Sequence, residues 1–96
     1  MNRYRILSDM PVKLINIGFG NYVSADKLIS VTAPDSAPIK RAVQVSREKG
    51  LLIDASFGRS TRAVLFMENG FIVLSALAPE TLSERFSDIT ATERME

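Results

Sequence analysis

The sequence predicts an α+β domain: a small, mixed or mostly antiparallel sheet of four or five strands, one main helix and a short C-terminal helix. Its 96 residues are enough for one domain, and 46% of them are apolar, as in a folded protein. Apolar runs of strand length alternate with turns rich in glycine or proline, whereas one segment alone has a clear helical period. We expect an N-terminal extension at residues 1–11, the domain at residues 12–87 and a frayed tail at residues 88–96.

The first strands are predicted around a glycine-rich turn. Residues 12–17 are mostly apolar, a pattern typical of a short buried strand. Residues 18–21 (Gly-Phe-Gly-Asn) include types that accept positive φ, so we expect the chain to turn there and residues 22–24 to return beside the first strand. The β-branched segment 28–33 is a further strand, which Pro34 ends.

A helix is predicted from about Ser36 to Lys49. Asp35 or Ser36 can accept hydrogen bonds from the amides of the first turn, and Pro38 fits there because it has no amide hydrogen. Gly50 suits the C-terminal end of the helix. Residues three and four apart form a narrow apolar stripe along it, made of Ile39, Ala42, Val43 and Ser46.

Residues 51–55, 63–67 and 71–77 are three further predicted strands, and residues 79–86 begin the short acidic helix. Asn69-Gly70, between the last two strands, is a strong hairpin signal. Both of these strands are apolar at nearly every position, which predicts burial on both faces of the sheet. Since one helix cannot cover two faces of a small sheet, we expect partner subunits to supply the second cover.

The chain contains neither histidine nor cysteine. Ser-His-Asp and Cys-His catalysis, imidazole and thiolate metal sites, and disulfides are therefore excluded for this chain alone. We expect no enzyme, no metal, no cofactor and no small-molecule substrate. The first twelve residues are interrupted by charges, and no apolar run reaches about 18 residues, so we also expect a cytoplasmic protein without a membrane partner.

The net charge of +1 hides an uneven distribution. Residues 1–67 carry ten lysines and arginines against five acids, whereas residues 68–96 carry two arginines against six acids. Such a division predicts one surface that faces a polyanion and another that does not. A solvated surface with an acidic tail is an equally good interpretation of the charges alone.

Two turns are candidate binding sites. Residues 18–21 follow a strand as phosphate-binding loops do, but the lysine and the third glycine of such loops are missing, which favours a structural hairpin with Phe19 at its tip. Residues 58–62 (Gly-Arg-Ser-Thr-Arg), hereafter the basic turn, place two guanidinium groups and two hydroxyls on a glycine-opened turn, a combination suited to phosphates. The alternative is a solvated turn whose arginine stems lie on apolar surface.

Several short blocks of the sequence match a known family in order and spacing. These blocks are residues 15–21, 23–25, 34, 36–41, 52–55, 58–59, 61–64, 74–76 and 79–81. On these blocks, which span about residues 12–86, the sequence resembles the RemA family of bacterial extracellular-matrix regulators.

This resemblance implies a small DNA-binding transcriptional regulator that forms closed, ring-like homo-oligomers and acts at biofilm-matrix promoters. The family's DNA-contacting basic residues correspond here to Lys27 and Arg59, while its next arginine is replaced by Ser60. We expect double-stranded DNA as partner, nucleoid association, and phosphates held by Lys27, Arg59 and Arg62 with help from Ser60 or Thr61. The alternative is an oligomeric protein-interaction scaffold that has lost DNA binding and docks partners on the acidic C-terminal helix.

Overall fold

The computed structural model describes residues 13–95, with side chains described for residues 13–87. The predicted extension at residues 1–11 lies outside this part of the chain. The fold is α+β, as predicted. Its elements, in chain order, are β1 (Leu14–Gly18), β2 (Asn21–Ser24), the 3-10 turn η1 (Ala25–Lys27), β3 (Leu28–Thr32), α2 (Ala37–Glu48), β4 (Leu52–Asp54), β5 (Ala63–Met67), the 3-10 turn η2 (Glu68–Gly70), β6 (Ile72–Ser75) and α3 (Pro79–Met95).

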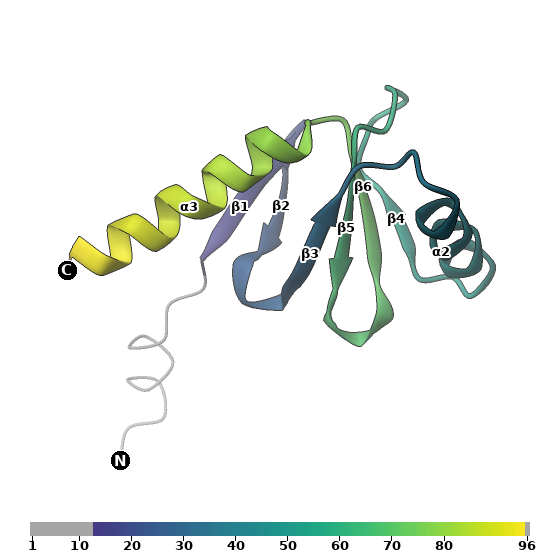
Figure 1. The fold of residues 1–96 in the computed structure, drawn as a ribbon, viewed down its shortest axis with the longest axis horizontal. Coiled ribbons are helices and arrows are strands. Elements are labelled where there is room, and N and C mark those ends of the chain that lie inside the picture. Colours follow the sequence, from purple (N-terminus) through teal and green to yellow (C-terminus); the bar gives the residue numbers. More distant parts are fainter. Residues whose placement is uncertain (1–12, 96) are drawn as a thin grey trace, which may run out of the picture.

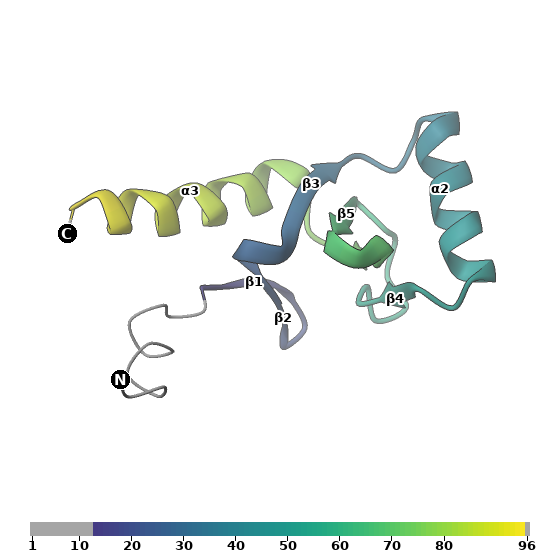
Figure 2. The same ribbon diagram turned by 90° about the horizontal axis from the view of Figure 1, so that it is seen from below.

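The strands form two sheets, where the sequence analysis predicted one. β1 and β2 pair only with each other, as an antiparallel hairpin. The other four strands lie in the order β3-β5-β6-β4, with β4 parallel to β6 and the remaining pairs antiparallel. The prediction of a mixed, mostly antiparallel arrangement is therefore correct, but the division into two sheets was not foreseen. Figures 1 and 2 place α2 and α3 on opposite flanks of the larger sheet.

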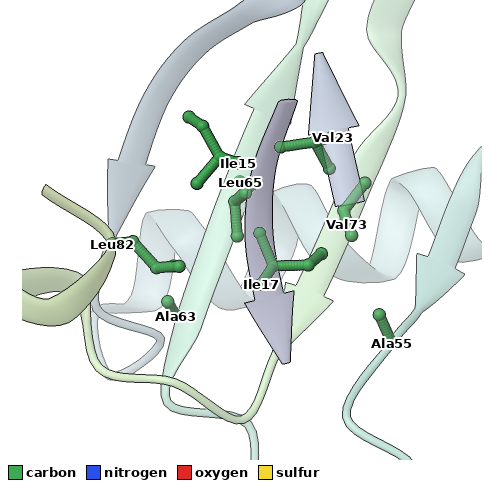
Figure 3. Packing of buried hydrophobic residues seen from close by; sticks show 8 residues of the cluster. All are labelled: Ile15, Ile17, Val23, Ala55, Ala63, Leu65, Val73 and Leu82. Atoms are coloured by element: carbon green, nitrogen blue, oxygen red, sulfur yellow. The ribbon is translucent and has the colours of Figure 1, made fainter. Parts of the chain in front are cut away.

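The second sheet explains how β5 and β6 are buried on both faces. On one face, Val64, Ile72 and Leu74 pack with the apolar stripe of α2. On the other, Leu65 and Val73 pack with residues of the β1–β2 hairpin, which crosses that face (Figure 3). The inference that partner subunits must supply the second cover was therefore wrong, because the chain folds its own hairpin over that face.

Two polar side chains join these layers. Ser75 is fully buried, and its hydroxyl donates to the carbonyl of Ile17 at 2.8 Å. Arg85 of α3 donates to the carbonyl of Asn16 at 2.7 Å, so the helix is tied to β1. α3 continues to Met95 and is thus longer than the short helix we predicted, and its backbone includes most of the segment assigned to a frayed tail.

The local signals of the sequence are confirmed at the ends of α2 and at the second hairpin. Ser36 is the N-cap, accepting from the amide of Ile39 at 3.4 Å. At the C-terminal end, Gly50 has φ +73° and the amide of Leu51 donates to the carbonyl of Ser46. Asn69 and Gly70 both have positive φ where β5 turns into β6. No helix in the described part of the chain is both long and apolar enough to cross a membrane.

Candidate nucleic-acid interface

The basic turn lies at one end of the larger sheet, between β4 and β5, where it projects beyond the strands (Figure 1). The tip of the β1–β2 hairpin reaches the same end, because the side-chain amide of Asn21 donates to the carbonyl of Gly18 at 3.0 Å and to that of Ala55 at 3.5 Å. Residues 18–21 and 55–62 together are called the arginine end below.

Asp54 and Ser56 fix the chain just before the basic turn. The amide and the hydroxyl of Ser56 both donate to one carboxylate oxygen of Asp54, at 2.9 and 2.5 Å. Ser56 itself is buried, and its carbonyl accepts from the amide of Arg59 at 3.0 Å. At the far side, the amide of Arg62 donates to the carbonyl of Ser75 at 2.8 Å. The turn is thus held on both sides by hydrogen bonds.

The same contacts act on the acidity of Asp54. The hydrogen bonds from the hydroxyl and then the amide of Ser56 lower the pKa of Asp54 below its ordinary 3.8, with a smaller contribution from the charge of Arg47. A carboxyl with a lowered pKa remains ionised at neutral pH. Asp54 therefore acts as a structural hydrogen-bond acceptor rather than as an acid.

An aromatic pair connects the hairpin tip to the chain before the basic turn. The rings of Phe19 and Phe57 stack with centroids 5.5 Å apart and an interplanar angle of 21°. The guanidinium carbon of Arg59 lies 5.5 Å from the centre of the Phe19 ring, within the range of a cation–π contact. Phe19, Phe57 and Arg59 are called the aromatic–arginine cluster below.

Sequence reasoning placed Phe19 at a hairpin tip but missed Phe57. Phe57 is 78% exposed, and Phe19 is 48% exposed. Both residues have positive φ, at +53° for Phe19 and +56° for Phe57, a conformation that costs a bulky residue about 1 kcal/mol or more. The one signal that the sequence offered is a phenylalanine set directly between a serine and a turn glycine.

The cations of the basic turn are available to a ligand. Arg59 and Arg62 are both exposed, and no ion pair to either is found among the residues that the structure describes. Ser60 is exposed and Thr61 half-buried, so both hydroxyls stand beside the guanidinium groups. Guanidinium groups and hydroxyls in this arrangement can bind phosphate oxygens with charge-assisted hydrogen bonds.

The remaining predicted site residue, Lys27, lies elsewhere. It ends η1, beside η2, and its ammonium group is 3.7 Å from a carboxylate oxygen of Glu68. Arg62 precedes β5 and Met67 ends it, so this strand separates the two places by about 16 Å. Residues 25–27 and 68–70 are called the lysine end. The structure therefore brings Arg59, Ser60, Thr61 and Arg62 together but leaves Lys27 apart from them.

No metal centre emerges from the described part of the chain, where no three acidic side chains gather closely enough to bind an ion. The hollows of the surface are open grooves. One of about 480 Å³ lies between β3 and α3, and another of about 350 Å³ lies between α2 and the basic turn.

Comparison with known proteins agrees with the resemblance described above. The family model for RemA-like proteins, described as extracellular matrix regulatory protein A-like, matches residues 14–86. The chain is 56% identical over 78 residues to extracellular matrix regulatory protein A of Bacillus subtilis strain 168, covering 81% of this chain and 88% of that protein.

Two further relatives are named as regulatory proteins. The one from Alkaliphilus metalliredigens strain QYMF is 51% identical over 87 residues, which cover 91% of this chain and 94% of the relative. The one from Clostridium perfringens strain SM101 is 54% identical over 78 residues, which cover 81% and 88%. Because the family model spans most of the chain and these relatives share more than half of the aligned residues, the chain belongs to the RemA-like family of extracellular matrix regulatory proteins.

Proposed function

We propose that this chain is a regulatory protein that binds double-stranded DNA through the basic turn. The observation that carries the proposal is the pair of exposed guanidinium groups, Arg59 and Arg62, on a turn that hydrogen bonds fix on both sides. Because the backbone of the turn is already fixed, binding costs little further backbone entropy, and the two guanidinium groups are presented to a phosphate backbone from defined positions. The name of the Bacillus subtilis relative supports targets among extracellular-matrix genes.

Within this proposal each residue has a distinct role. Arg59 and Arg62 hold phosphates, with Ser60 and Thr61 donating hydroxyl hydrogen bonds to the same backbone. Lys27 contributes from the lysine end, after exchanging its weak surface pair with Glu68 for a phosphate. Because a guanidinium cannot be tuned to act as a base, this set of residues supports binding rather than catalysis. We accordingly infer a non-enzymatic, nucleoid-associated cytoplasmic protein.

We also propose that copies of the chain assemble head to tail into a ring. β3 and β4 are the two edge strands of the larger sheet, and the outer edge of each is unpaired within the described residues. Each edge carries an exposed isoleucine: Ile29 on β3 is 67% exposed and Ile53 on β4 is 50% exposed. Joining two different edges is a heterologous contact, which closes into a ring when the rotation between copies permits.

Assembly also compensates for the small number of cations per chain. Ser60 takes the place of the arginine that the RemA resemblance leads one to expect, so each basic turn offers two guanidinium groups. One phosphate contact changes DNA affinity by only about 3.5-fold between 50 and 200 mM salt. Several turns presented on one particle raise the overall affinity through effective concentration, without any further contact within one turn.

The decisive experiment is a mobility-shift titration from low to moderate salt with unrelated duplexes. Arg59→Ala should weaken binding to all of them and make the salt dependence less steep, because one phosphate contact per subunit is lost. Arg41→Ala, which removes an exposed arginine from α2, is the matched control and should change affinity less. Equal losses for the two variants would contradict the assignment of the basic turn.

Light scattering on the same samples tests the ring. A particle of several times the 10.6 kDa chain mass, unchanged in Arg59→Ala, is the expected result. A single-chain mass would contradict assembly, and a smaller particle in the variant would make Arg59 a subunit contact. Absence of any shift at low salt would instead favour the protein-interaction scaffold, for which the replacement of the family's arginine by Ser60 is the supporting observation.

A further inference from the structure

The aromatic–arginine cluster is unusual because two of its residues have a strained backbone although they lie outside the core. Phe19 and Phe57 are the two phenylalanines with positive φ, and both present much of their ring area to solvent. Positive φ at a bulky residue is unfavourable and persists where the surrounding structure imposes it, most often at functional sites. The third non-glycine residue with positive φ among the described residues is Asn69, a residue type that accepts it readily.

The Phe57 ring is held in place even though it is exposed. The residue before it, Ser56, is buried and bonded twice to Asp54, and the turn closes through the bond from Arg59 to the Ser56 carbonyl. One face of the ring stacks on Phe19. Phe57 is therefore a rigid apolar protrusion, and binding through it costs little additional side-chain entropy.

The chemistry around the protrusion indicates its ligand. Arg59 stands beside the aromatic pair, so one projection presents an apolar ring next to a cation. Duplex DNA matches both the apolar ring and the neighbouring cation, because its negatively charged backbones flank a stack of planar base pairs. Proteins that bend DNA in this way insert an apolar side chain between base pairs while cations hold the adjacent phosphates.

We propose that Phe57 acts as a wedge that enters a base step of the bound duplex and bends it, with Arg59 on the neighbouring phosphate. This proposal rests on the DNA binding proposed above. It adds a source of sequence preference that phosphate contacts cannot provide: flexible steps such as TA unstack more easily than A-tracts. Repeated around a ring, wedges of this kind would curve the duplex along the particle.

The test uses the full chain with two duplexes of equal length. One has a central TA step with 2-aminopurine in place of its adenine, and the other has an A-tract with the same label. We expect wild type to raise the fluorescence of the first, to bend it, and to bind it several-fold more tightly than the second. Phe57→Asn tolerates positive φ but lacks the ring, so it should lose the fluorescence change and the bend, and bind the TA duplex about tenfold more weakly.

Two further variants complete the design. Phe57→Leu keeps an apolar wedge and should retain most of the bend. Phe71→Ala removes another exposed phenylalanine, next to the lysine end, and should leave both signals unchanged.

The outcomes separate the wedge from the proposed function. Binding by Phe57→Asn with unchanged bend and fluorescence would overturn the wedge while leaving DNA binding intact. A smaller particle in Phe57→Asn would also overturn it, by making Phe57 a contact between copies or with another protein. No binding by wild type at any salt concentration would overturn the proposed function, and the wedge with it.

Discussion

The two ends of the larger sheet are built in opposite ways. At the lysine end, residue types match their conformations: Asn69 and Gly70 adopt positive φ at little cost, and Lys27 lies near the opposite charge of Glu68. At the arginine end, two phenylalanines adopt the same unfavourable backbone conformation and two arginines lack an ion pair within the described residues.

Under the proposed function, the arginine end is the part of the molecule that binds a partner. A turn whose only role is to connect strands can use residues that relax locally, as the lysine end does. Conformational strain raises the free energy of the isolated chain and persists mostly at functional sites, whereas exposed arginines without an ion pair remain available to a polyanion. The predictions below exploit this contrast and run from the largest expected effect to the smallest.

Restoring a cation at the arginine end should have the largest effect. Ser60→Arg adds one guanidinium to each basic turn, so log affinity should fall more steeply with log salt, by about 0.9 for each added phosphate contact. In the proposed assembly several copies act together, so the gain in affinity at low salt multiplies over the particle. Mobility shifts over a salt series measure it.

Gln44→Arg, which adds the same charge on the exposed surface of α2, is the matched control. A comparable gain from this control would mean that net charge alone governs binding, and the contrast between the two ends would lose its meaning.

Removing the support of the basic turn should have the next largest effect. Asp54→Ala leaves the amide and hydroxyl of the buried Ser56 without their acceptor, which should lower the free energy of unfolding by about 1 to 3 kcal/mol in urea titrations. DNA binding should weaken as well, because Arg59 is held through Ser56. Asp26→Ala, at an exposed acid of η1, should change neither quantity appreciably.

The pH dependence of stability gives an independent test of this support. The pKa of Asp54 is lowered in the folded chain, so its stabilising contribution is complete above the ordinary 3.8 and is lost as pH falls through the folded value. Asp54→Asn retains an acceptor oxygen but cannot titrate. Its unfolding free energy should therefore decline less steeply with acid than that of wild type, and an identical decline would contradict the assignment.

Much of this architecture could be predicted because the signals are local. Ser36, Gly50 and the Asn69-Gly70 pair each act through their own backbone conformation and neighbouring amides, and the structure confirms all three. The position of the basic turn followed similarly from Gly58 and the polar residues after it. Such features depend on a few consecutive residues, which a sequence displays directly.

The layers and the aromatic pair depend on contacts between distant residues. The apolar pattern of β5 and β6 correctly indicated two buried faces, but it could not show that the β1–β2 hairpin covers one of them. Likewise, Phe19 and Phe57 are 38 positions apart, and no sequence pattern in either segment predicts that their rings stack. Periodicity shows that a face is buried, whereas the identity of the covering element is decided by tertiary packing.

The smallest effect is expected at the lysine end, where Lys27→Gln removes the pair with Glu68. Both side chains are at least half exposed, so the free energy of unfolding should change by less than about 1 kcal/mol. DNA affinity should fall less than in Arg59→Ala, since Lys27 must first leave Glu68. Glu68→Gln is the complementary variant, because it frees Lys27 and should raise affinity slightly at low salt. If Lys27→Gln instead weakened binding as much as Arg59→Ala, the two ends of the sheet would contribute equally to DNA binding, and the functional contrast between them would be wrong.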